Sequence, residues 1–280
     1  MELENKYEVT PEKRSEEFKK ALNQIMKDFI PNKCKSNTPL FILAGGQPGS
    51  GKTALIDTIK QQNQKDNFVV IDLDNYRKYH PDFEEIKEKH KKDGVLLTNS
   101  FAFAVENAML SYVIENKLNT INVSTLRNTD MIEKFIIKRI NPNGFQISAY
   151  IMAVIPEESY FSALKRYLEQ QRDPNCVIRH TGKDFHDISY RNLDITIKML
   201  EKLGVPITIC KRAPKKEEPA QIVCRDSLED SLSKIEQIRK NEKDIIITKI
   251  QRENLDFPDE DIEIKKEYIT FKKDLDILSN

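Results

Sequence analysis

A motif that is typical of phosphate-binding loops occupies residues 46–53, with the sequence Gly46, Gln47, Pro48, Gly49, Ser50, Gly51, Lys52 and Thr53. Its glycines let the backbone approach a polyphosphate with the N–H groups pointing inward, and the following helix N-terminus adds positive potential. Lys52 can reach the β- and γ-phosphates, and the Thr53 hydroxyl can ligate Mg²⁺. A glycine-rich turn without a ligand would not need this lysine and threonine between an apolar run and a helix. We therefore expect these eight residues to bind a polyphosphate.

Two carboxylates, Asp72 and Asp74, follow the second apolar run of the chain, residues 68–71. They are two residues apart, so an extended chain would place them on the same side. One could accept the proton of a substrate hydroxyl as a general base, while the other orients metal-bound water or a neighbouring amide. The alternative is that Asp74 only caps the following helix. We favour the interpretation as a general base.

Two arginines, Arg166 and Arg179, could hold phosphates, because a guanidinium group matches the geometry of phosphoryl oxygens. From the residues alone, a solvated surface side chain is an equally good interpretation. His180 and His186 lack metal-ligand spacing, and we interpret both as structural. The charged loop that begins at Lys211 and Arg212 is interpreted as solvated.

Composition narrows the class of protein. The chain has 280 residues, and its 45 Lys and Arg equal its 45 Asp and Glu, so no basic field argues for nucleic acid as the main partner. No apolar run approaches the roughly 18 residues that span a bilayer, and residues 1–6 are charged, unlike a signal peptide. The four cysteines are scattered, which argues against a zinc site or a disulfide framework. We expect a cytoplasmic protein without a membrane segment.

Apolar runs and helical patterns alternate along the chain, which predicts parallel βαβ units. We expect an α/β fold with a doubly wound, mostly parallel sheet and additional C-terminal helices. The ligand crevice of such a sheet lies at the carboxyl ends of the strands. The expected strands are 41–44, 68–74, 120–125, 146–154 and 206–210. The expected helices are 8–30, 82–92, 98–116, 129–139, 157–171, 185–203 and 226–243.

A set of motifs in a fixed order resembles the zeta toxins of bacterial epsilon/zeta toxin–antitoxin systems, over about residues 15–210. The set comprises residues 45–53, 71–74 with His80 and Pro81, 124–130, 165–167, Arg179, and His186 with Asp187. Zeta toxins are P-loop kinases that phosphorylate the 3′-hydroxyl of the amino sugar in UDP-N-acetylglucosamine and so block cell-wall synthesis. A small helical antitoxin inhibits them by obstructing the ATP site.

This resemblance implies a P-loop kinase-like fold, ATP and Mg²⁺ as cofactors, a UDP-sugar substrate and a separate helical antitoxin. It divides the chain into an N-terminal helix packed on the core (1–36), a kinase domain (37–212) and a charged helical extension (213–280). The implied catalytic residues are Lys52, Asp74 as the general base, and Arg166 and Arg179 on the transferring phosphoryl group. The residues implied to hold the sugar nucleotide are Glu106, Thr125 and Arg127.

One departure from the family pattern concerns Val123, which stands where zeta toxins usually have a glutamate. Valine can neither hold metal-bound water nor orient a polar group, and Asn122 would point to the opposite face of the strand. Phe101 and Phe103 lie where substrate contacts are expected, so the acceptor could differ. The alternatives are a kinase for another hydroxyl, such as an antibiotic, a nucleoside or a polynucleotide end, and a nucleotide-binding module without turnover.

Overall fold

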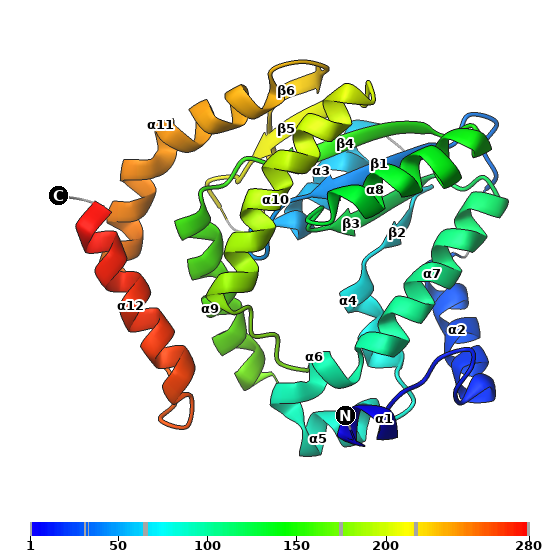
Figure 1. Cartoon of the computed structure of the whole chain (residues 1–280), viewed down its shortest axis with the longest axis horizontal. Coiled ribbons are helices and arrows are strands. Elements are labelled where there is room, and N and C mark those ends of the chain that lie inside the picture. Colours follow the sequence, from blue (N-terminus) through cyan, green and yellow to red (C-terminus); the bar gives the residue numbers. More distant parts are fainter. Residues whose placement is uncertain are drawn as a thin grey trace.

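A mostly parallel sheet forms the centre of the chain in the computed structural model, which describes residues 2–30, 32, 34–63, 67–173, 176–215 and 218–278 (Figure 1). Its strands are β1 (Leu40–Gly45), β2 (Val69–Ile71), β3 (Thr120–Ser124), β4 (Gln146–Met152), β5 (Ile207–Lys211) and β6 (Gln221–Ser227). They lie in the order β2-β3-β1-β4-β5-β6. Only β6 runs antiparallel among them. The expected α/β fold with a mostly parallel sheet is confirmed.

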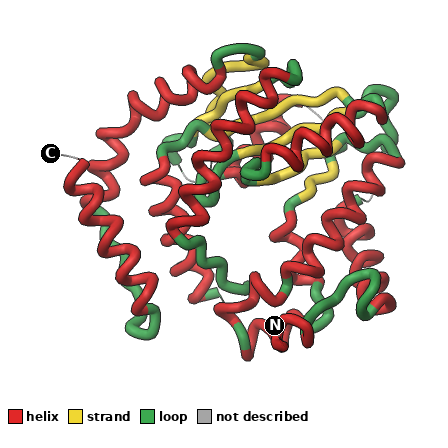
Figure 2. Tube along the Cα trace, in the orientation of Figure 1, coloured by secondary structure: helices red, strands yellow, loops and turns green. Residues whose placement is uncertain are grey.

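Helices account for most of the remaining described chain (Figure 2). They are α1 (Glu2–Lys6), α2 (Ser15–Phe29), α3 (Lys52–Asn63), α4 (Leu73–Tyr76), α5 (Phe83–Lys89), α6 (Gly94–Leu97), α7 (Asn99–Glu115), α8 (Thr129–Phe135), α9 (Pro156–Arg172), α10 (Lys183–Lys202), α11 (Ser231–Arg252) and α12 (Ile262–Leu278). Short turns of other helix types are η1 (Arg77–Tyr79), η2 (Lys91–Asp93), η3 (Ile136–Ile140) and η4 (Asn141–Asn143). No helix in the described ranges is long and apolar enough to cross a membrane.

Alternate residues of β1 serve the two faces of the sheet, which is why the run is apolar throughout. Phe41 and Leu43 join the larger core cluster, together with residues of α7 and α10. Ile42 and Ala44 face the opposite way and pack with residues of α3. The strand is therefore buried on both faces, and this fixes the position of the loop that follows it.

Two expected elements have other bounds than predicted, and one strand was not predicted. The helix expected over 8–30 covers only 15–29, and residues 8–14 are an extended and bent segment. The strand expected over 68–74 ends at Ile71, because the Asp72 side chain accepts a hydrogen bond from the Asp74 amide and starts a helix there. Strand β6 was missed, since it is an edge strand whose side chains are mostly exposed and carry little apolar signal.

Helices α11 and α12, residues 231–278, are called the C-terminal arm below. The helix expected over 226–243 starts and ends later, at 231 and 252, and a second helix follows it. The arm shares a separate apolar cluster with helix α9, to which it contributes Ile247, Phe271 and Leu275. Figure 1 shows α11 starting beside β5 and β6 and the arm then running along the side of the molecule next to α9.

Candidate active site

A cleft of about 2360 Å³ opens at the carboxyl ends of the parallel strands and gathers most of the residues singled out by the sequence. Those that line it are Pro48, Gly49, Gly51, Lys52, Thr53, Asp72, Asp74, Glu106, Val123, Thr125, Arg127, Arg166 and Arg179. Of the expected loop residues, Gly46, Gln47 and Ser50 do not line it. The residues come from six or more separate segments, which only the tertiary structure brings together.

The phosphate loop needs glycine at two positions because of the backbone conformation there, and at one of them also because of a close contact. Gly49 and Gly51 have φ values of 76° and 98°, a region that residues with a side chain rarely adopt. A Cβ atom on Gly49 would also lie 2.0 Å from the carbonyl oxygen of Ser159 in α9. Glycine at position 49 therefore allows helix α9 to pack directly on the loop.

Gln47 supports the loop from inside the protein. Its Nε2 donates to the Val154 carbonyl at 2.9 Å and to Ser159 Oγ at 3.1 Å. Ser159 Oγ in turn lies 2.8 Å from His186 Nε2, and His186 Nδ1 lies 3.0 Å from Asp187. Burial lowers the pKa of His186, which favours a neutral ring. His186 therefore acts as a structural support, as interpreted from the sequence.

Lys52 points back at its own loop. Its Nζ donates to the carbonyl oxygens of Gly46 at 2.7 Å and Gln47 at 3.1 Å. Removal from solvent lowers its pKa to about 8, and the positive charge of Arg166 acts in the same direction. Both hydrogen-bond partners of this ammonium group are uncharged carbonyls, and a bound polyphosphate would provide an anionic partner instead.

Asp74 lies between two arginines. Its Oδ1 accepts a hydrogen bond from Arg77 Nε at 2.9 Å, and its Oδ2 is paired with Arg179 Nη1. Burial would raise the pKa of this carboxyl, but Arg179 and Arg77 lower it to about 2. The two aspartates do not share one face of a strand as expected, because Asp74 lies in α4 and Asp72 caps it.

Arg77 was not singled out from the sequence, although it connects Asp74 to the protein interior. Its Nη1 donates to the Val95 carbonyl and to Thr98 Oγ1, both at 2.9 Å. Arg77 is buried, and its guanidinium donates hydrogen bonds to Asp74, Val95 and Thr98. Its i,i+3 spacing from Asp74 was the one signal available in the sequence.

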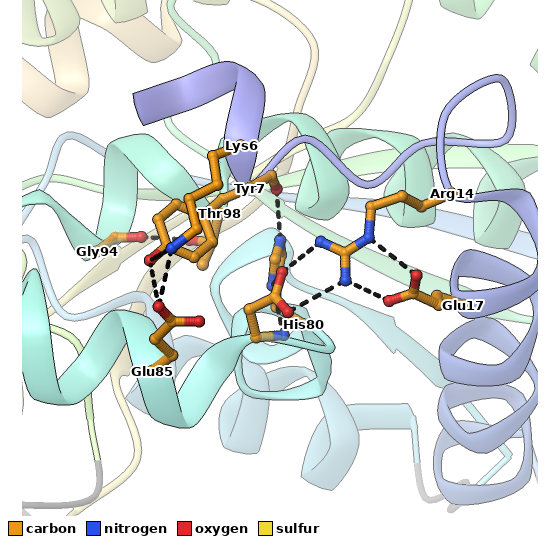
Figure 3. A network of polar contacts seen from close by, with 9 residues as sticks. Lys6, Tyr7, Arg14, Glu17, His80, Glu85, Gly94 and Thr98 are labelled. Atoms are coloured by element: carbon orange, nitrogen blue, oxygen red, sulfur yellow. Dashed lines mark hydrogen bonds and ion pairs between the residues drawn. The ribbon is translucent and has the colours of Figure 1, made fainter. Parts of the chain in front are cut away.

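The turn that follows Arg77 is held by the N-terminal segment (Figure 3). His80 Nε2 lies 2.9 Å from the Tyr7 carbonyl, and His80 Nδ1 accepts from the Asp82 amide at 3.1 Å. Arg14 pairs with both Asp82 and Glu17. Tyr7 and Arg14, which are more than 50 positions before Asp74 in the sequence, thus hold the turn that follows the helix with this candidate base.

Arg166 faces the same part of the cleft from helix α9. Its Nη2 donates to Thr181 Oγ1 at 3.3 Å, and its Nε is buried without a partner among the described residues. Burial and the nearby Arg179 lower its pKa to about 10. The two arginines and Lys52 therefore form a cluster of positive charge, in which Arg166 Nε is available to donate a hydrogen bond to a ligand.

Glu106 forms part of another wall of the cleft, half-buried in α7. Burial raises its pKa to about 7, the charge of Asp72 adds to this, and the Asn122 amide partly offsets it. Burial also raises the pKa of Asp72, and Asp74 adds to that effect. The Tyr76 hydroxyl nearby is buried without a partner among the described residues. Near neutral pH this wall can hold or release a proton.

Thr125 and Arg127 flank Leu126, a buried residue with a φ of 53° that turns the chain after β3. The Arg127 guanidinium carbon lies 4.3 Å above the centre of the Phe185 ring. Phe103 is 51% exposed and lines the cleft, whereas Phe101 is buried in the core. The expectation that both phenylalanines face the substrate is therefore wrong for Phe101.

Arg212 was interpreted as part of a solvated loop, and this was wrong. Its Nε donates to the Ser50 carbonyl at 3.3 Å, and its Nη2 contacts the Gly49 carbonyl. Its Nη1 donates to Glu158 at 3.1 Å and to Ser162 at 2.9 Å. Arg212 therefore joins the phosphate loop to helix α9, a contact that sequence spacing could not indicate.

Val123 is 8% exposed and belongs to the apolar cluster behind the phosphate loop, with Leu55 and Ile59 of α3. Within the described ranges, no three His, Cys, Asp or Glu residues gather where they could hold a metal ion. Mg²⁺ needs no such group, since it usually keeps several waters and binds one or two protein oxygens plus substrate phosphates. Thr53, at the rim of the loop, suits that arrangement.

Comparison with known proteins gives consistent matches. The sequence model of the family described as Zeta toxin matches residues 23–217. The chain is 34% identical to Toxin PezT of Streptococcus pneumoniae over 190 residues, which cover 68% of this chain and 74% of that protein. It is 31% identical to Toxin zeta of Streptococcus pyogenes over 189 residues, covering 68% of this chain and 65% of the relative. The chain thus spans slightly less than two thirds of that relative.

A solved structure from the PezAT chromosomal toxin–antitoxin system of S. pneumoniae has a similar fold. The two structures superpose with a TM-score of 0.62 at 26% identity, covering 83% of this chain and 97% of that chain. The similarity therefore extends beyond the residues that the sequence model matches.

The raised pKa of Glu106 predicts a pH-dependent stability difference. A carboxyl whose pKa is higher in the folded chain than its usual 4.5 binds more protons when folded, so stability is lost as pH rises toward about 7. Glu106→Gln, which cannot ionise, should match wild type at pH 5 and exceed it by on the order of 1–2 kcal/mol at pH 8. Urea unfolding at both pH values measures this, with Glu115→Gln on the same helix as the control. Equal differences at both pH values would contradict it.

Proposed function

Because this chain belongs to the zeta toxin family, we propose that it is a kinase that transfers the γ-phosphoryl group of ATP to a hydroxyl of a small molecule. The observation that carries the proposal is the arrangement in one cleft of Lys52, Arg166 and Arg179 opposite the carboxylate of Asp74. Phosphoryl transfer needs this combination, with cations on the phosphates and a carboxylate at the attacking hydroxyl.

The proposed acceptor is the 3′-hydroxyl of the amino sugar in UDP-N-acetylglucosamine or a related UDP-sugar, whose loss would block cell-wall synthesis. In this proposal Glu106, Thr125 and Arg127 hold the sugar nucleotide. All three line the same cleft as the phosphate loop. ATP and nucleotide sugars occur together in the cytoplasm, which is the compartment that we propose.

The ion pair between Asp74 and Arg179 suggests how the base is used. Without nucleotide, Arg179 occupies Oδ2 of Asp74 and holds the carboxyl pKa near 2, so the carboxylate is a poor proton acceptor. A γ-phosphate would compete for Arg179 and free Oδ2 for the acceptor hydroxyl. Arg77 would stay on Oδ1 and keep the carboxylate oriented. The base would then become effective only after ATP binds.

The residues around the loop would hold the rest of the nucleotide. Backbone N–H groups of 46–53 and the α3 N-terminus would bind the phosphates, with Lys52 moving from its carbonyl partners to the β- and γ-phosphates. Thr53 would hold Mg²⁺, which supplies charge neutralisation on the phosphates when bound. Arg166 would stabilise charge on the transferring group, with the buried Nε as a free donor.

Incubation with ATP, Mg²⁺ and a panel of UDP-sugars, followed by mass spectrometry, tests the activity. We expect one UDP-sugar to gain one phosphoryl group. Lys52→Ala should lower the rate by a factor of about 10² or more, because it removes the loop's only side-chain charge on the β- and γ-phosphates. Turnover near the wild-type rate in that variant would show that the phosphate loop is not catalytic.

Asp74→Asn separates catalysis from nucleotide binding. The amide keeps the shape but cannot take up a proton, so transfer should fall at least about 10²-fold, while ATP affinity should be kept or rise because Arg179 no longer pairs with a carboxylate. Single-turnover assays and calorimetric titration with ATP measure the two effects. Asp72→Asn is the matched control, since Asp72 caps α4 and we expect it to retain most of the activity. An inactive Asp72→Asn beside an active Asp74→Asn would reverse the roles.

We further propose a small helical antitoxin that binds near the phosphate loop and competes with ATP. The relatives support it, since one similar structure comes from a toxin–antitoxin system. Expression of the chain alone in a bacterium that makes peptidoglycan should then arrest growth, and the Lys52→Ala variant should not. Equal growth of both strains would count against a toxin and favour a housekeeping kinase.

A second candidate is a nucleotide-binding protein without turnover. Its support is Val123, an apolar residue where zeta toxins usually have a glutamate, set in an apolar cluster. The panel of UDP-sugars decides between the two. ATP binding without transfer to any acceptor, including water, would favour this second candidate.

A further inference from the structure

The C-terminal arm, helices α11 and α12, lies outside residues 23–217, so the family match assigns it no role. It packs against the two segments that carry the phosphate-binding arginines of the proposed function. Arg166 is in helix α9, and Arg179 is in the segment 177–181, which we call the Arg179 segment. The shared apolar cluster contains Phe161 from α9, Ile178 from the Arg179 segment, and Phe271 from the arm.

Both chain neighbours of Arg179 contact the arm or its cluster. Ile178 is buried and belongs to the apolar cluster that also contains Ile247 and Tyr268 of the arm. The His180 Nε2 atom lies 3.3 Å from Glu267 Oε2 in α12. The Arg179 backbone is also held from α9, because its N–H donates to Gln170 Oε1 at 2.9 Å. The backbone from which the Arg179 side chain extends is therefore held by contacts of both neighbouring residues.

The surroundings of Arg166 repeat this arrangement. Its neighbour Lys165 pairs with Glu253, at the end of α11. Its other neighbour, Tyr167, packs edge-on against the His180 ring with centroids 5.6 Å apart. Four residues that flank the two arginines thus contact the arm, its cluster or each other.

Glu267 joins the two segments to each other. The same oxygen that faces His180, Oε2, accepts a hydrogen bond from the Tyr160 hydroxyl of α9 at 3.0 Å. The chain that leads into α12 adds a second link, since the buried Asp261 binds Gln171 of α9 and Lys92 of η2. The arm therefore connects α9, the Arg179 segment and the region before α6.

We propose that the C-terminal arm positions Arg166 and Arg179 for the γ-phosphate, with Glu267 as the positioning residue that ties the Arg179 segment to α9. This inference rests on the proposed function, in which both arginines bind that phosphate. A half-exposed acid contributes little to fold stability, about 0–1 kcal/mol for such a pair. In contrast, a guanidinium that is displaced by about 1 Å stabilises the transferring phosphoryl group much less.

Calorimetric titration of the full chain with ATP and with ADP tests the proposal without any acceptor. The arginines are assigned to the γ-phosphate, which ADP lacks. Glu267→Ala should therefore weaken ATP binding about tenfold and leave ADP binding unchanged. Glu267→Gln should restore most of the ATP affinity, because the amide oxygen can still accept from Tyr160. Asp259→Ala, on the exposed chain before α12, is the control and should match wild type.

A double variant shows whether Glu267 acts through Arg179. In an Arg179→Ala background, Glu267→Ala should have no further effect on the ratio of ATP to ADP affinity. Full additivity, or equal losses for ATP and ADP in Glu267→Ala with an unchanged unfolding midpoint, would overturn the proposal. A wild-type chain that binds ATP no better than ADP would instead count against the proposed γ-phosphate site itself. If wild type and Glu267→Ala prefer ATP over ADP to the same extent, the positioning role of the arm is wrong and the proposed γ-phosphate site is unaffected.

Discussion

The phosphate loop and helix α9 approach so closely that a Cβ atom on Gly49 would lie 2.0 Å from the Ser159 carbonyl oxygen. This contact sets the distance between the loop and a helix that also carries Arg166. Gln47 and Arg212 strengthen it from either side, through Ser159 Oγ and through Glu158 and Ser162. Since one helix bears both the support and the arginine, a shift of α9 would disturb the binding of phosphates and the group that stabilises their transfer together.

The charges in the cleft are poorly balanced without a ligand. Lys52 and Arg166 both have lowered pKa values, in each case from burial and from the positive charge of a nearby arginine. Asp72 and Glu106 have raised pKa values, mainly because they are buried; the charge of Asp74 adds to the effect at Asp72, and the charge of Asp72 adds to it at Glu106. In contrast to these two carboxyls, Asp74, which is paired with Arg77 and Arg179, has a pKa below its usual value. A polyphosphate would relieve the repulsion among the cations, and the free energy of that relief would favour its binding.

Local signals in the sequence predicted the elements with strong apolar runs. Strand β1 is apolar at every position because both its faces are buried, and the pattern of glycines, lysine and threonine after it is typical of a phosphate loop. The Asp72 region was predicted less well, since a short capped helix and a strand end with two aspartates look alike until the Asp74 amide is seen bonded to Asp72. Edge strand β6 carried little apolar signal because most of its side chains are exposed.

The sequence by itself determined the phosphate loop, the α/β order of elements and the family resemblance, because each depends on residues that are close together in the chain. Only the tertiary structure decided that Arg179 pairs with Asp74, that Arg212 holds the loop and that Glu267 reaches His180. Each of these contacts joins residues about 90 to 160 positions apart. A charged side chain at such a distance has many possible partners, and packing of the helices selects one of them.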